Sequence, residues 1–238
     1  MIVRDGFAVV DPREPGGEPN GRITIDARSG CRNLVQRVFE VTRAGLDQPG
    51  RAGSEEVGYV AGGSGRLVAG GDVLSLEPAT GFLVPAGTPY RLEADGSAMS
   101  IVSVVCPPPG EPGPDAPAGP GACVAVREAD QEPLPAGESR TFKLLVDPAV
   151  GCRGVTQFLG FIKQSRAPEH VHTYEEVIHI LGGAGTLHAA GERIPFERGS
   201  SIYLAPGTPH CLENGTSETL RLLGVFSPAG SPADKRED

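Results

Sequence analysis

Four side chains in the second half of the chain have the types and spacing of a metal site. His170 and His172 lie two residues apart, so an extended segment presents both imidazoles on one face. Glu176 follows after a short bend, and His210 comes from a later strand, behind the Pro206-Gly207 pair. Imidazole suits Zn, Cu, Fe and Ni, and a carboxylate adds tolerance for Mn. The sequence therefore predicts one divalent transition metal (Fe, Mn, Ni, Cu or Zn) with positions left open for water or substrate.

The elements that position these residues are predicted to be short strands. The 34 glycines and 23 prolines among 238 residues disfavour long helices. Gly70-Gly71 and Ala190-Gly191 fall between strand-like runs, where residues that tolerate positive φ make tight hairpins. We therefore expect an all-β chain of two small barrels or sandwiches. The apolar runs with a period of two cover residues 35–41, 57–61, 66–69, 82–84, 100–105, 155–162, 177–181, 202–204 and 220–226.

An internal repeat divides the chain into two copies. Residues 55–65 match residues 175–185 at an offset of 120 residues, and further matches keep that register downstream. Upstream, residues 30–32 match residues 151–153 at an offset of 121. A register this long indicates duplication. The predicted domains are a barrel over 1–106, a Pro/Gly-rich connector over 107–122, a second barrel over 123–230 and a polar tail over 231–238.

The second copy resembles the cupin family, and the duplicated chain resembles a bicupin with two tandem barrels. The first cupin motif is G-x5-H-x-H-x3,4-E-x6-G. This chain matches it at His170, His172, Glu176 and Gly183, with Gln164 in place of the leading glycine. The resemblance implies jelly-roll barrels and assigns both histidines and the glutamate as metal ligands.

The second cupin motif, G-x5-P-x-G-x2-H-x3-N, also has a counterpart here. The chain matches it at Gly199, Gly207, His210 and Asn214, and Ala205 stands where the first proline is expected. The resemblance makes His210 the fourth ligand.

Cupins carry many activities, so the fold does not fix the function. The resemblance favours an oxidoreductase of the dioxygenase type that acts on a small oxygen-rich metabolite, with Glu176 able to double as a base. One alternative is a metal-dependent isomerase or hydrolase, such as ureidoglycine aminohydrolase, although the ligand set of that family departs from the pattern here. Another is a cupin that binds a small molecule without chemistry. Gln157, Phe161 and Tyr203 lie in strand-like runs of the second barrel and are predicted to bind substrate.

The first copy lacks most of the metal ligands. Tyr90 stands where His210 stands in the second copy, residues 49–53 replace the histidine pair, and Glu56 is retained. One carboxylate does not hold a metal, so this barrel is predicted to be metal-free and structural. The alternative is a metal-independent pocket containing Arg51, Glu56 and Tyr90.

Other titratable residues near the motifs are predicted to stay outside the metal site. Strand parity points His179 to the face opposite Glu176, and His188 is expected to be a hydrogen-bonded side chain. Glu175 is the neighbouring alternative to Glu176, which the family spacing favours.

The net charge and the cysteines restrict the expected binding partners and cell compartment. A net charge of −9 disfavours nucleic acid and anionic membranes. No apolar run approaches the roughly 20 residues of a membrane span, and Arg4 and Asp5 argue against a signal peptide. Five scattered cysteines without a CxxC pair predict reduced thiols and a cytoplasmic protein. The expected partner is a small-molecule substrate, and the resemblance allows a homodimer paired through edge strands.

Overall fold

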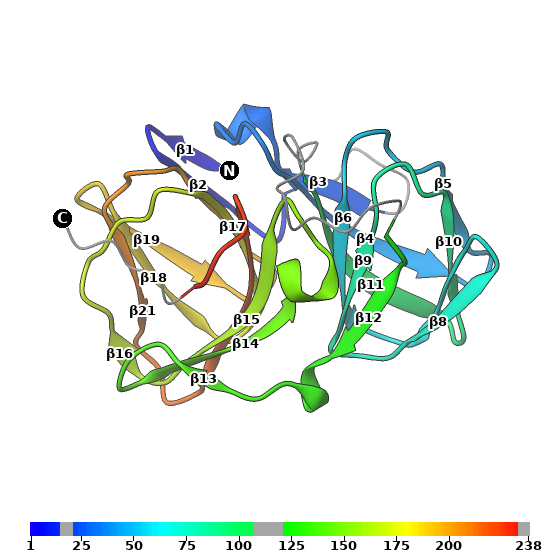
Figure 1. Ribbon diagram of the computed structural model, residues 1–238. Coiled ribbons are helices and arrows are strands. Elements are labelled where there is room, and N and C mark those ends of the chain that lie inside the picture. The colour runs from blue at the N-terminus through cyan, green and yellow to red at the C-terminus, as the bar shows by residue number, and fades with distance from the viewer. Residues whose placement is uncertain (15–20, 107–120, 233–238) are drawn as a thin grey trace.

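The computed structural model describes residues 1–14, 21–106 and 121–232 (Figure 1). Nearly all of the predicted connector and tail lies outside these residues. The described residues form strands and three short 3₁₀ helices, as the all-β prediction expected. None of the described helices is long or apolar enough to cross a membrane. The 3₁₀ helices are η1 (Ala27–Ser29), η2 (Glu128–Asp130) and η3 (Pro148–Val150).

The strands follow the short apolar runs in both halves of the chain. Those before residue 107 are β1 (Ile2–Arg4), β2 (Phe7–Val10), β3 (Gly21–Ile25), β4 (Val35–Thr42), β5 (Leu46–Gln48), β6 (Glu56–Gly62), β7 (Gly65–Ala69), β8 (Asp72–Leu76), β9 (Thr80–Val84), β10 (Tyr90–Ala94) and β11 (Ala98–Val105). Those after residue 120 are β12 (Val124–Arg127), β13 (Leu134–Pro135), β14 (Arg140–Val146), β15 (Thr156–Ile162), β16 (Ser165–Arg166), β17 (Glu175–Gly182), β18 (Ala184–Ala189), β19 (Glu192–Glu197), β20 (Ser201–Leu204), β21 (His210–Asn214) and β22 (Leu220–Ser227).

Each half is a sandwich of one large and one small sheet. In the first half, a sheet of order β12-β9-β6-β11-β4-β3 faces one of order β5-β10-β7-β8. In the second, β1-β2-β20-β17-β22-β15-β14-β13 faces β16-β21-β18-β19. A separate apolar core fills each sandwich, one including Phe39 and Leu92 and the other Phe158 and Leu212. Each core holds its two sheets together face to face, and this packing fixes where the inward side chains meet.

The two large sheets pack against each other, as the strands at the centre of Figure 1 show. A third apolar cluster lies between them, with Val57 and Tyr59 from the first half and Val177 and Val225 from the second. The central strands β6, β15 and β17 are therefore largely buried on both faces, which removes the apolar and polar alternation of a half-exposed strand.

A strand near the start of each copy pairs with the other half of the molecule. Strand β2 pairs with β20, so that Phe7 lies opposite Leu204, and β12 pairs with β9, so that Val124 lies opposite Leu83. The predicted barrels over 1–106 and 123–230 place each of these strands with its own copy, whereas in the structure each strand completes a sheet of the other half. Periodicity identifies a strand, but it carries no information on which sheet edge the strand completes.

The repeat is reproduced in local detail at η1 and η3. Asp26 and Asp147 cap these turns by accepting a backbone N–H, and Gly30 and Gly151 end them with φ of 88° and 98°. Glycine is needed there because other residues rarely adopt that conformation. Both turns deliver the loops that follow to the contact between the halves.

A glutamate from each half binds the loop of the other half through hydrogen bonds to its backbone. Glu175 accepts the backbone N–H groups of Arg32 and Asn33 at 2.9 Å each. In the mirror arrangement, Glu55 accepts those of Arg153 and Gly154 at 3.0 and 2.9 Å. In each Glu-Glu pair, the first glutamate joins the halves and leaves the second to face the barrel interior.

Replacing Glu175 with alanine is expected to lower the free energy of unfolding by about 2–4 kcal/mol, because donors that it satisfies lose a charged acceptor. Urea denaturation followed by circular dichroism measures the change. The exposed Glu132 provides the control, and its alanine variant should stay within about 0.5 kcal/mol of wild type. An effect of Glu175→Ala as small as that of the control would contradict the proposed role of Glu175 in joining the halves.

Candidate metal centre

Three of the four predicted ligands converge in the second barrel. One donor atom from each of His172, Glu176 and His210 lies within 4.8 Å of the other two, and all three residues are buried. Glu176 is on β17 and His210 begins β21, whereas His172 lies in the segment before β17.

A tight turn between β20 and β21 holds His210 against the segment that carries His172. The Thr208 N–H donates to the Ala205 carbonyl at 3.2 Å, and Gly207 has φ of 75°. These features fit the type II turn expected at Pro206-Gly207. The Gly207 N–H also donates to the carbonyl of His172 at 2.8 Å. The turn therefore fixes the approach of His210 to His172.

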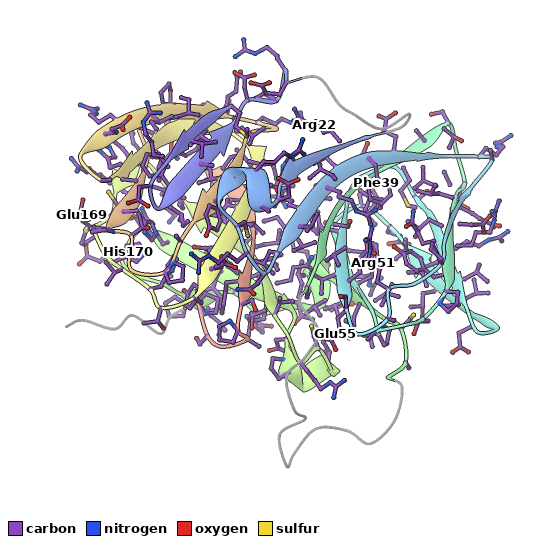
Figure 2. The ribbon with its side chains drawn as sticks, turned by 90° about the horizontal axis from the view of Figure 1, so that it is seen from above. Arg22, Phe39, Arg51, Glu55, Glu169 and His170 are labelled. Atoms are coloured by element: carbon purple, nitrogen blue, oxygen red, sulfur yellow. The ribbon has the colours of Figure 1, made fainter. Side chains whose placement is uncertain are left out.

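His170 lies beside this cluster rather than within it. Its backbone exchanges two hydrogen bonds of 3.0 Å with that of His210, and the two imidazole centroids are 4.5 Å apart. It lines the same cavity as the other three, and Figure 2 shows it next to Glu169 at the edge of the second half. The structure thus places all four predicted ligands around one end of one cavity.

The three imidazoles are held in the same way. Each Nδ1 faces a backbone carbonyl oxygen, which only accepts hydrogen bonds, so each Nδ1 is assigned the ring proton. In the neutral rings, Nε2 then carries the lone pair that a metal needs. Backbone carbonyls commonly orient metal-ligating histidines in this way. The contacts are His172 to Tyr174 at 2.9 Å, His210 to Thr208 at 2.8 Å and His170 to Pro168 at 3.3 Å.

The pair formed by His172 and Glu176 fits a cation. His172 Nε2 lies 3.1 Å from Glu176 Oε2. With the ring proton on Nδ1, both atoms are acceptors, and two acceptors at this distance require a proton or a metal ion between them. Two imidazoles and a carboxylate in one buried cluster are a donor set for a first-row divalent metal.

The ionisation of the cluster also suits a metal. Burial alone would raise the pKa of Glu176, but the adjacent His172 and the nearby imidazoles of His210 and His170 outweigh it and lower that pKa. Burial lowers the pKa of His210 to about 4. At neutral pH the carboxylate is ionised and the His210 imidazole is neutral, which are the forms that bind metals.

A cavity of about 600 Å³ opens from the cluster. Its wall includes Phe142, Phe158 and Ile178 from the core of the second sandwich. Tyr174 also lines it, with its ring stacked between His172 and Phe226 at centroid distances of 4.2 Å on both sides. Tyr174 was not among the predicted site residues, although its place between the histidine pair and the glutamate was a usable signal.

Two of the three predicted substrate residues point away from this cavity. The Gln157 side chain donates to the Gly58 carbonyl of the first half at 3.2 Å, and the Tyr203 hydroxyl donates to Glu175 at 3.0 Å. Phe161 does line the cavity, and the Arg221 guanidinium lies over its ring at 5.5 Å. Phe158, Gly160 and Ile162 of β15 also line the cavity, whereas Gln157 faces the first half of the molecule.

The two remaining histidines make hydrogen bonds outside the metal cluster. His179 Nδ1 lies 3.1 Å from the Ser201 hydroxyl, and His188 Nε2 lies 2.6 Å from Glu213. Both therefore have protein partners, and the hydrogen bond predicted for His188 is present.

His179 makes the stability of the fold depend on pH. Burial lowers its pKa from 6.5 to about 4, so the folded protein resists protonation that the unfolded chain accepts. Its stabilising contribution is present above pH 6.5 and is lost as the pH falls toward 4, by about 3 kcal/mol in total. In urea titrations between pH 7 and 4, His179→Gln should lose less stability than wild type. Equal losses in the two proteins would contradict this role.

In the first barrel, a buried arginine forms an ion pair with the retained glutamate. The Arg37 guanidinium donates to Glu56 at 2.5 Å, and both side chains are buried. Arg37 aligns with Phe158 of the second copy. Burial and the neighbouring Glu56 raise the pKa of Tyr90, and Arg51 lies within the same half in Figure 2. Arg51 was predicted to lie in a pocket with Glu56, whereas Arg37, which neutralises this glutamate, was not predicted.

Comparisons with known proteins agree with this architecture. Residues 159–226 match the model of the family described as Cupin domain. An uncharacterized protein of Aquifex aeolicus is 35% identical over 75 residues, and the match covers 32% of this chain and 61% of that relative's length.

Solved structures match over nearly the whole chain at low identity. Protein Ylba from E. coli has a TM-score of 0.76 and 17% identity, with 95% of this chain and 93% of that chain covered. The oxalate decarboxylase of Bacillus subtilis, whose Mn(II) centres have been studied, has a TM-score of 0.74 and 15% identity, with coverages of 97% and 79%. Residues 159–226 therefore match a cupin domain, and the chain as a whole has the fold of a bicupin.

Proposed function

We propose that this protein is a metal-dependent oxidoreductase of the dioxygenase type that acts on a small oxygen-rich metabolite. One divalent metal is held in the second barrel by His170, His172, Glu176 and His210. The observation that carries the proposal is the pair of facing acceptors, His172 Nε2 and Glu176 Oε2, at 3.1 Å. The Mn(II) centres of the structurally similar oxalate decarboxylase support including manganese among the ions to test.

Residues of the chain have separate roles around that metal. When bound, the ion would supply Lewis-acid and redox chemistry to a coordinated substrate oxygen. Glu176 is buried and ionised, so a carboxylate oxygen can accept a proton from the substrate. Phe142, Phe158 and Ile178 give the cavity an apolar wall that limits bulk water.

Oxygen consumption tests the reaction class. Iron-, manganese-, nickel- and copper-loaded protein should be offered catechols, flavonols, diketones and 2-oxo acids in an oxygen electrode. We expect uptake with at least one pair of metal and substrate class, and a loss of about 100-fold or more in Glu176→Gln. If no loaded form consumes oxygen with any class, the dioxygenase assignment is wrong and an isomerase, hydrolase or binding role takes its place.

A further inference from the structure

A half-buried arginine in the cavity wall has no carboxylate partner. Arg140 begins β14 and lines the cavity, and no acidic side chain in the described part of the chain comes within ion-pair distance of it. Burial lowers its pKa, as expected for a cation without a compensating carboxylate. By contrast, the guanidinium groups of Arg37 and Arg221 each contact a glutamate, at 2.5 and 2.7 Å.

The position of this guanidinium relative to the metal cluster is fixed by β21. Arg140 donates to the carbonyl oxygen of Leu212 at 2.5 Å. Leu212 lies two residues beyond His210 on the same strand, a separation of about 7 Å at the usual rise of a strand. A ligand that contacts both the Arg140 guanidinium and the metal cluster must span a distance of this order.

The wall that accompanies these two ends is apolar and aromatic. Phe142 and Phe158 meet edge to face with ring centroids 6.4 Å apart, and Leu222 lies in the same wall. Among the described residues that line the cavity, the acids are Glu176, in the metal cluster, and the exposed Glu138. Arg166 adds a second cation to the lining. The cavity therefore combines metal ligands, an apolar wall and an excess of basic side chains away from the metal.

We propose that the substrate at this site is an amphipathic carboxylic acid. Its carboxylate pairs with Arg140, its apolar body packs on Phe142 and Phe158, and a second oxygen group reaches the metal cluster. This inference rests on the proposed metal site and narrows its substrate class. Oxalate is excluded as the best ligand because its two carboxyl carbons are bonded directly, which makes the molecule too short to contact both Arg140 and the metal cluster. A cavity of about 600 Å³ also has room for an aromatic ring or a short chain.

Matched probes separate the carboxylate from the rest of the ligand. We would load the full chain with Zn²⁺, which has no redox chemistry, and titrate it calorimetrically with 3,4-dihydroxyphenylacetate and with 4-methylcatechol. The probes share a catechol head, and only the first carries a carboxylate. Wild type should bind the acid about 10-fold or more tightly than the neutral probe, and Arg140→Leu should remove that preference while keeping its affinity for 4-methylcatechol.

Controls make each result decisive. The exposed Arg198 does not line the cavity, so Arg198→Leu should keep the preference of wild type. Zinc content and affinity for 4-methylcatechol report whether Arg140→Leu retains an intact site, and Arg140→Lys, which keeps the charge, should keep part of the preference. Wild type that prefers the acid by less than about twofold, or does not bind it, overturns the inference, as does an Arg140→Leu variant that retains the preference. Wild type that does not retain zinc contradicts the proposed metal site itself.

Discussion

Replacing Arg37 with methionine is expected to lower the free energy of unfolding by about 3–5 kcal/mol. The change leaves Glu56, which is 6% exposed, as a buried charge without its partner at 2.5 Å. Urea denaturation at neutral pH measures the loss. The double variant Arg37→Met/Glu56→Leu should recover most of it, because an apolar pair needs no compensating charge.

An exposed ion pair provides the comparison for that experiment. Arg127 contacts Asp130 at 2.8 Å, with side chains 57% and 53% exposed. Arg127→Met should cost less than about 1 kcal/mol, since water screens the pair. If Arg37→Met were no more destabilising than Arg127→Met, the arginine would not be neutralising a buried carboxylate in the first barrel.

Zinc is expected to stabilise the metal-free protein strongly. A ligand that binds the folded state alone, at about 1,000 times its Kd, adds about 4 kcal/mol to the free energy of unfolding. For a chain of this length, that corresponds to a rise in Tm of about 8–16 °C. Thermal denaturation of chelator-treated protein, with and without added Zn²⁺, measures the effect.

Two variants assign the stabilisation to the cluster. His172→Ala/His210→Ala should show almost no rise in Tm, because both imidazole donors are lost. His188→Gln should keep the full rise, since His188 contacts Glu213 and lies outside the cluster. A full rise in the double alanine variant, or its loss in His188→Gln, would place the zinc elsewhere.

Local signals in the sequence predicted the strands and turns well. The Gly70-Gly71 and Ala190-Gly191 pairs adopt positive φ between paired strands, because such residues tolerate the hairpin conformation. The partners of β2 and β12 could not be predicted in the same way. Their exchange between halves depends on which sheet edges the whole fold leaves open, and no short segment encodes that.

Strand faces were predictable only where one face meets solvent. Strand β15 is buried on both faces, so its polar Gln157 looked like a residue of the site. The structure instead uses that amide to satisfy the Gly58 carbonyl between the halves. A buried polar residue in such a strand needs a partner, but the sequence does not say on which side the partner lies.

The candidate ligands were predictable because their spacing is local. His170, His172 and Glu176 follow one another within seven residues, and a Pro-Gly turn delivers His210. Arg37 and Arg140 gave no such signal, since an arginine in an alternating strand is usually exposed. Only the folded sheets bring Arg37 to Glu56 and Arg140 to the carbonyl of Leu212.

The metal content of the purified protein tests the central claim most directly. Elemental analysis should find about one first-row divalent metal per chain in wild type. The double variant His170→Ala/His172→Ala should retain less than about a tenth of that amount, because it loses two of four ligands. Undiminished metal in the double variant would contradict a site in the second barrel.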